Sequence, residues 1–170
     1  MANPVFDTVR TVMAVRDFQN KPVADDIVRR TVEAGRLSAS ASNKQPWHFV
    51  VVRDPDNIRK LGSLVRTGPY NAKAAFAVIV ATDKGNPLAV SDASRAIQSM
   101  ILTAWADGVG SNWTGFSGLD GVRREFGLPD TVEVLAVLPF GYPAHAVKGI
   151  KKRKPLAEVA STERFGSPFS

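Results

Sequence analysis

The order of the expected elements predicts an α+β sandwich and not a doubly wound parallel sheet. Along the 170 residues, apolar periodicity indicates helix, helix, strand, helix, strand, helix, strand and strand, without the strict alternation of a Rossmann fold. The stretch from Ala74 to Thr82 is too apolar for an exposed face, which places it in the middle of a sheet. The helix from Ala93 to Trp105 is apolar around much of its circumference, so we expect it to be central and fully buried.

Two helices open the chain. Asn3 and Pro4 form an N-cap and first-turn pair. We expect Asp25 to cap the second helix, whose apolar face runs to about Leu37. The first helix is amphipathic, because apolar residues recur at helical spacing at Val5, Phe6, Val9 and Met13.

The remaining elements follow in a simple order. A polar loop over 38–46 leads into a β-branched and aromatic run over 47–52, which predicts a buried strand. Asp54 and Pro55 open a short helix, and Gly108 ends the long one at a C′ position. The core is completed by a glycine-rich turn over 108–118, a short helix ending at Gly127 and a strand from Val132 to Phe140.

We expect a single domain over residues 1–170, in which 143–170 form an extended C-terminal tail. The chain has no cysteine, which excludes disulfides, thiolate metal sites and cysteine nucleophiles. The uncharged stretches, such as Ala96 to Ala106, are all well short of the roughly 20 residues that a membrane span needs. A cytoplasmic protein without membrane contact is therefore expected.

The positive charge is local. The formal net charge is +6, and without one cluster the chain is nearly neutral. Such a cluster suits a solvated tail, a patch for polyanions or a clamp for one small phosphate, because close cations raise the local potential where they converge. The five cations that form it are Lys148, Lys151, Lys152, Arg153 and Lys154.

The sequence is poor in acid–base and nucleophilic groups. His48 and His145 are far apart and have no ligand-spaced partners, so no metal site is expected, and no G-x-S-x-G motif occurs. A protein of this kind is suited to a cofactor that carries the chemistry, which leaves no catalytic side chain to assign. The polar loop offers Ser40, Asn43 and Gln45, which could hydrogen-bond the edge of a flat heterocycle, although an ordinary helix-to-strand loop would have the same composition.

Several motifs resemble the FMN-dependent nitroreductase family. The family pattern is approximately R-R-S/A-V-R-x-F followed by P-S-A-x-N-x-Q-P-W, and this chain has AVRDF over 14–18 and SASNKQPWHFVVV over 40–52. The stretch 92–110 resembles the long core helix and glycine exit of the family. GYP over 141–143 and KKRKPL over 151–156 resemble its closing segments. The resemblance covers nearly the whole chain in the right order.

This resemblance implies a central, mostly antiparallel sheet flanked by helices and an intertwined homodimer with FMN at the subunit interface. Electrons would come from NADH or NADPH and pass through flavin N5 to a nitroaromatic, quinone or similar small acceptor. By position, Arg16, Lys151 and Arg153 would contact the phosphate. Ser40 and Asn43 would lie beside the isoalloxazine ring, and the ring would be lined by Trp113, Thr114 and Gly115.

Two departures from the family pattern affect cofactor binding. Val12 and Met13 stand where the family usually has arginine, which removes one or two phosphate contacts, and Ala39 replaces the usual proline, which loosens the loop. The alternative function is therefore an FMN-binding or flavin-sequestering protein with little turnover. A nucleic-acid-binding module would rest on the basic tail alone, and we do not expect nucleic acid as a partner.

Overall fold

A four-stranded antiparallel sheet forms the centre of the described part of the chain and confirms the α+β class. The structure is a computed structural model that describes residues 3–115 and 117–169. The register pairs Trp47 with Thr82 and Phe76 with Phe140. In their order across the sheet, the strands are β1 (Trp47–Val52), β2 (Phe76–Asp83), β4 (Val132–Gly141) and β3 (Gly110–Ser111).

Strand β2 is the middle of the core, as its apolar sequence predicts. Its side chains alternate between two faces, so Phe76 and Val78 join one apolar cluster while Ala77 and Ile79 join another. All four residues are fully buried. Because both faces are covered, a strand without polar alternation is stable here.

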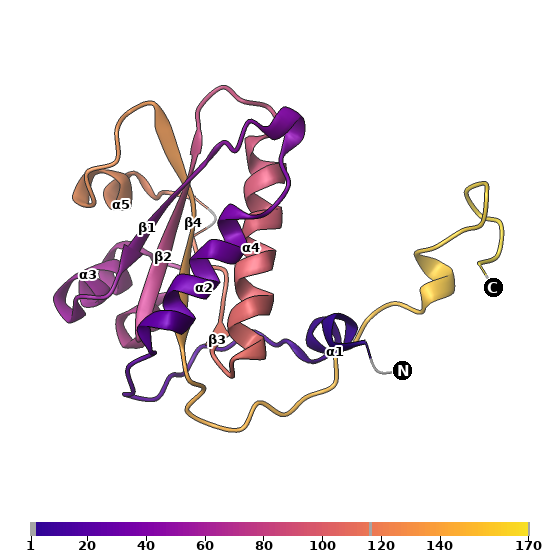
Figure 1. Ribbon diagram of the computed structural model, residues 1–170, viewed down its shortest axis with the longest axis horizontal. Coiled ribbons are helices and arrows are strands. Elements are labelled where there is room, and N and C mark those ends of the chain that lie inside the picture. Colours follow the sequence, from indigo (N-terminus) through magenta and orange to yellow (C-terminus); the bar gives the residue numbers. More distant parts are fainter. Residues whose placement is uncertain (1–2, 116, 170) are drawn as a thin grey trace.

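The helices cover the two faces of the sheet (Figure 1). α2 and α4 lie together on one face, and α3 and α5 lie on the other. The short helix α5 lies between β3 and β4 in the sequence and matches the expected short helix ending at Gly127, which the overall order of elements had left out. The bounds are α2 (Asp25–Arg36), α3 (Pro55–Leu64), α4 (Ala89–Ala106) and α5 (Asp120–Glu125).

The helix ends agree with most of the predicted caps. The Asn3 side chain accepts a hydrogen bond from the Phe6 amide at 3.0 Å, and Gly108 follows α4 with a φ of 76°. The prediction for α2 was wrong in one respect. Its N-cap is Ala24, and Asp25 is the first helical residue, where its charge favours the helix dipole without closing a cap.

Helix α4 is not fully buried, which corrects the expectation from its sequence. One face packs against α2 and the sheet through residues such as Ile97 and Met100, whereas Gln98 is exposed and Ile101 and Trp105 are half-buried. The apolar residues on the outer side are therefore left without full cover in one chain.

The first helix and the last segment extend away from the sheet (Figure 1). α1 (Pro4–Thr11) has no buried residue, and its Phe6 side chain is 61% exposed. No helix among the described residues is long and apolar enough to span a membrane. Short 3-10 helices occur at η1 (Ala41–Asn43), η2 (Pro69–Lys73) and η3 (Leu156–Glu158).

Candidate functional site

A hollow of about 570 Å³ lies between the end of α1, the outer side of α4 and the basic segment of the tail. Its volume is in the range of small-molecule sites. It brings together Trp113, Lys151 and Arg153 from the predicted set, and it also contains Val12 and Met13. The other lining residues are Val9, Ala14, Gln98, Ile101, Ser111 and Asn112.

Two cations mark one side of this hollow. Lys151 donates from Nζ to the Val9 carbonyl at 2.6 Å. This bond satisfies one of the carbonyls that have no helical partner near the end of α1. Burial lowers the pKa of the Lys151 ammonium group, and the neighbouring Arg153 lowers it further. Arg153 donates from Nη1 to the Lys152 carbonyl at 2.8 Å, and its five N–H donors leave capacity for an anion. This side can therefore hold a phosphate or a carboxylate.

The other walls are apolar and aromatic. Trp113 is half-buried and packs against the main core cluster. Met13 lies close to the tail, since a Cβ added at Gly149 would lie 3.0 Å from the Met13 methyl carbon. The Asn112 amide donates to the Tyr70 hydroxyl, which fixes that amide at the edge of the hollow. A flat aromatic ligand with an anionic end matches these walls.

Thr114 and Gly115 lie in the interior next to Trp113 and do not line the hollow. Thr114 is 1% exposed, and its hydroxyl donates to the Val137 carbonyl at 2.6 Å while accepting from the Asn71 amide. The Gly115 amide donates to the Thr67 hydroxyl at 3.0 Å, and its φ of 76° favours glycine. In one chain, these residues support the turn that carries Trp113.

Arg16 is exposed and lies just outside the hollow. The segment before it is attached to the sheet, because Ala14 forms a parallel bridge with Ser111 and the Val15 amide donates to the Ser111 carbonyl at 2.9 Å. Arg16 therefore follows a fixed stretch of backbone. It lies two residues after Ala14, which is part of the hollow wall.

Ser40 and Asn43 lie at a different place, in the loop that follows α2. The Ser40 hydroxyl accepts a hydrogen bond from the Gln45 amide at 2.9 Å, and Asn43 is exposed with a φ of 54°. The loop is attached to α4 through the Ala41 amide, which donates to Asp92 Oδ2 at 3.0 Å. Figure 1 shows this loop at the beginning of α4 and α1 near its end.

The geometry of α4 places the loop and the hollow on opposite sides of the helix. Asp92 and Ile101 are nine residues apart, and at about 100° per residue they differ by about 180° around the axis. Asp92 contacts the loop, whereas Ile101 lines the hollow. One chain therefore does not bring Ser40 and Asn43 together with Lys151 and Arg153.

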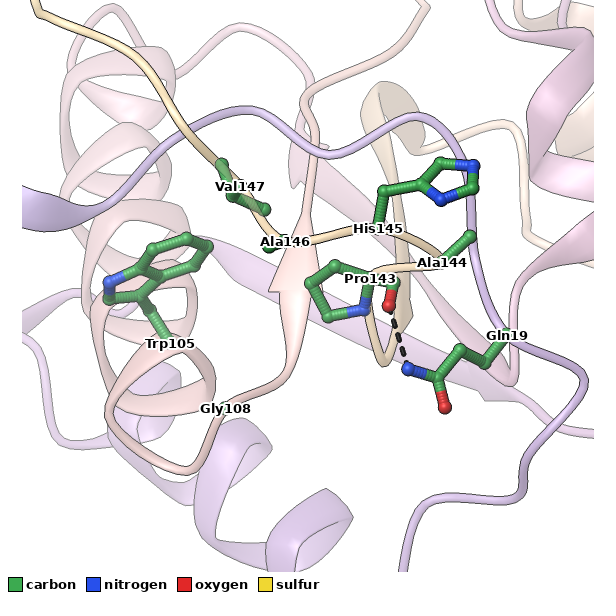
Figure 2. A pocket seen from close by; sticks show the side chains of 8 residues that line it. All are labelled: Gln19, Trp105, Gly108, Pro143, Ala144, His145, Ala146 and Val147. Atoms are coloured by element: carbon green, nitrogen blue, oxygen red, sulfur yellow. Dashed lines mark hydrogen bonds between the residues drawn. The ribbon is translucent and has the colours of Figure 1, made fainter.

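A second hollow, of about 520 Å³, lies where the tail leaves the sheet. Figure 2 shows Trp105 of α4 and Val147 on one side of it, and Gln19, which donates to the Pro143 carbonyl at 2.8 Å, on another. None of the predicted site residues lines this hollow. We therefore assign the candidate site to the hollow with the cations.

The histidines do not form a metal centre. His48 Nε2 lies 3.0 Å from Asp83 Oδ1, and His145 Nε2 lies 3.5 Å from Asp17 Oδ2, and both imidazoles are exposed. Residues 3–115 and 117–169 contain no group of three potential metal ligands.

Comparison with known proteins identifies the family. The sequence profile of the nitroreductase family matches residues 9–83 and 66–142. A Methanothermobacter thermautotrophicus protein with the provisional name NADH dehydrogenase/NAD(P)H nitroreductase is 32% identical in an alignment of 148 positions that covers 82% of this chain and 78% of that protein. The chain belongs to the nitroreductase family, which makes it an oxidoreductase by class.

Solved structures agree with this assignment. A Bacteroides thetaiotaomicron protein with the same provisional name has a TM-score of 0.88 and 28% identity, covering 97% of this chain and 100% of that one. A Desulfovibrio desulfuricans protein, described as a nitroreductase in complex with FMN, has a TM-score of 0.84 and 29% identity, covering 97% and 99%. The predicted fold is thereby confirmed.

Asp92, Asn112 and Gln98 were not among the residues predicted for the site. Gln98 and Asn112 line the hollow, and Asp92 anchors the loop. The sequence pattern could have identified Asp92, because an acidic residue on the core face of an otherwise apolar helix requires a partner. No sequence pattern indicates Asn112, since its neighbour Tyr70 comes from a distant segment.

Proposed function

We propose that the protein is an FMN-dependent oxidoreductase that passes electrons from NADH or NADPH to a nitroaromatic, a quinone or a similar small acceptor. The observation that carries the proposal is the hollow in which Lys151 and Arg153 stand at one side and Trp113, Val12 and Met13 form the walls. A ligand with a phosphate on a flat, largely apolar ring system requires cations at one end and apolar walls around the ring.

The residues present fit such a cofactor. Lys151 and Arg153 hold the phosphate, because a guanidinium and an ammonium supply charge-assisted donors. Trp113 contacts the ring. The chemistry that FMN supplies when bound is hydride acceptance at N5 and electron delivery to the acceptor. The apolar walls exclude water from the ring, and the FMN complex of the Desulfovibrio relative supports the choice of cofactor.

The complete site is proposed to form between two copies of the chain. Ser40 and Asn43 lie across α4 from the cations of their own chain, so the loop that reaches a given ring comes from the partner copy. The unpaired apolar surfaces support this arrangement, because α1 and the tail expose Phe6, Ile150 and Phe165. A homodimer covers these side chains and unites the two halves of the site.

The proposed electron donor and the proposed acceptor rest on different observations. The name of the Methanothermobacter relative supports NADH or NADPH as donor. The acceptor is assigned only as a flat, electron-poor molecule, because such a molecule can stack in a hollow with aromatic and apolar walls.

The second candidate, a flavin-sequestering protein with little turnover, is favoured by one observation. Val12 and Met13 occupy the wall beside the cations, where arginine would have added phosphate contacts. The two functions differ in steady-state rate. An enzyme oxidises NADH or NADPH in the presence of a quinone with many turnovers per bound flavin, whereas a sequestering protein does not.

The test begins with the visible absorption spectrum of the purified protein, with and without added FMN. The proposed function predicts a yellow protein, or one that becomes yellow and gains thermal stability with FMN. A colourless protein without an FMN-induced shift would overturn it. Binding of a polyanion with a steep salt dependence, and no flavin binding, would instead favour a nucleic-acid-binding module.

A further inference from the structure

The loop that carries Ser40 and Asn43 has a conformation that its sequence does not favour. Ser42, Asn43 and Gln45 have φ values of 50°, 54° and 49°. Only a few per cent of non-glycine residues adopt this left-handed region, and of these three Asn tolerates it best. Three such residues within four positions persist only where surrounding contacts hold them.

Asp92 supplies a buried anchor for this loop. Its side chain is 1% exposed, and Oδ2 accepts the Ala41 amide hydrogen at 3.0 Å. Ala41 begins the short helix η1, directly between Ser40 and the first left-handed residue. Because the acceptor is a carboxylate in the interior, this bond is of the strong, charge-assisted kind.

The other contacts of the loop act at its ends. The Ser38 hydroxyl donates to the Ser99 hydroxyl at 2.8 Å, before the strained residues begin. The Gln45 amide donates to the Ser40 hydroxyl at 2.9 Å, which closes the loop on itself without attaching it to the body. Asp92 is therefore the anchor that attaches the middle of the loop to α4.

Arg95 approaches the other oxygen of the same carboxylate. Its Nη2 lies 3.1 Å from Asp92 Oδ1, one helical turn further along α4, and the arginine side chain is 55% exposed. An ion pair that is open to water on one side contributes little by itself. Arg95 thus offers a matched control, because removing it changes the charge around Asp92 and keeps the bond to Ala41.

We propose that Asp92 is a positioning residue for the flavin ring. It acts through the Ala41 amide, which holds the loop between the extended Ser40 and the left-handed Asn43 so that the polar atoms of both face the ring. The inference rests on the proposed function, because it concerns the same site. Without the carboxylate, the backbone over 42–45 relaxes to ordinary φ values and the two side chains lose their places.

The experiment compares Asp92→Ala and Asp92→Asn with two controls, Arg95→Gln and Ser99→Ala. The dissociation constants of FMN and of riboflavin, the visible spectrum of the bound flavin and the melting temperature without flavin are measured for each. The loop contacts the ring and not the phosphate, so both ligands report on it. Arg153→Ala serves as the contrast, since it should weaken FMN and leave riboflavin unchanged.

We expect Asp92→Ala to weaken both ligands by about tenfold or more and to shift the bound-flavin spectrum. Asp92→Asn, which keeps an acceptor oxygen, should weaken both by about threefold, and the two controls should stay within about twofold. A lower melting temperature with flavin binding and spectrum unchanged would show a purely structural role and overturn the inference.

If Asp92→Ala does not fold, Asp92→Asn decides, because it keeps the shape of the side chain. Flavin binding within twofold of the unmodified protein, with the same spectrum, would then overturn the inference. Failure of the unmodified protein to bind flavin would overturn the proposed function itself and the inference with it, so the two failures are distinguishable.

Discussion

The ammonium nitrogen of Lys151 lies 2.6 Å from the carbonyl oxygen of Val9, which ties the basic tail segment to the last turn of α1. This bond places a partly buried cation at the wall of the candidate site, where burial lowers the pKa of its ammonium group. Arg153, the next cation on that wall, lowers the pKa further. The basic cluster therefore has an ordered part, which a purely solvated tail would lack.

The lowered pKa of Lys151 predicts a pH dependence of FMN binding. Between the folded-state pKa and the ordinary value, the folded protein binds fewer protons than the unfolded chain, so the ligand-free protein gains stability as pH rises through this window. A bound phosphate favours the charged ammonium, so FMN binding takes up protons there. FMN affinity should consequently fall as pH rises, beginning below the ordinary lysine pKa.

Titrations of FMN from about pH 7 to about pH 10 measure how the affinity changes with pH. In Lys151→Met, the part of this pH dependence that comes from the lysine should disappear. Riboflavin has the same ring and no phosphate, so titration of the ring appears with both ligands. An equal slope for FMN and riboflavin would show that Lys151 does not meet the phosphate.

Arg153 and Lys154 should differ although they are neighbours. Arg153 lines the hollow, and Lys154 is exposed and is not part of that wall. Arg153→Ala should weaken FMN binding by about tenfold, since a guanidinium can make two charge-assisted bonds to one phosphate. Lys154→Ala should change it by less than about twofold. Equal losses, measured by fluorescence titration at one ionic strength, would indicate a diffuse basic patch.

Met13→Arg should restore a phosphate contact. Met13 lies on the wall that also carries Lys151 and Arg153, two residues after α1 ends. A new charge-assisted bond would contribute about 1.5 to 3 kcal/mol before side-chain ordering is subtracted. FMN binding should tighten by about threefold to thirtyfold.

The opposing possibility for Met13 is a packing role, because its methyl group lies close to Gly149 of the tail, where an added Cβ would be 3.0 Å away. FMN titration together with melting of the ligand-free protein separates the two. Tighter binding at little cost in melting temperature supports the phosphate position. A lower melting temperature without a gain in affinity would place the phosphate elsewhere.

The sequence determined the elements better than it determined their relation in space. The apolar run in β2 was enough to predict a central strand, and the resemblance of the tail motif predicted that Lys151 and Arg153 would lie together. The positions of Ser40 and Asn43 across α4 depend on how α2 packs on that helix. Helical periodicity gives the faces of α4 and does not say which neighbour each face meets.

The exposed apolar face of α1 shows a second limit. Periodicity predicted the amphipathic helix, although α1 ends at Thr11 and leaves Met13 outside it. An amphipathic helix can pack on its own chain or on another. The cap of α2 shows a third, because Asp25 suits both the cap and the first turn, and the structure selects the first turn.

Gly115 should be required for the turn that carries Trp113. A Cβ at this position would lie 2.8 Å from the Leu119 methyl groups, in addition to the cost of its positive φ. Gly118 is a matched control, because its φ of 72° is similar and a Cβ there meets nothing within 4 Å. Gly118→Ala should cost about 1 kcal/mol of unfolding free energy, from the backbone alone.

Gly115→Ala should cost about 1 to 3 kcal/mol more than Gly118→Ala, because the buried Leu119 side chain must move. Denaturant unfolding without FMN measures both. Equal costs would mean that the turn adapts easily and that Trp113 is not held by it.

The central claim is that one FMN site takes its loop from one copy and its cations from the other. Two variant chains test it: one carries Ser40→Ala with Asn43→Ala, and the other carries Arg153→Ala. Each variant alone should form dimers in which both sites are weakened. In a purified mixed dimer of the two, one site contains all the substitutions and the other contains none.

The decisive measurement is FMN titration of that mixed dimer. The two chains carry different affinity tags, so that the mixed dimer can be purified. The shared site predicts one FMN per dimer bound with the affinity of the unmodified protein, alongside one very weak site. Two weakened sites, one without the loop side chains and one without Arg153, and no site of unmodified affinity would show that each chain builds its site alone. A monomer by light scattering at micromolar concentration would contradict the claim as directly.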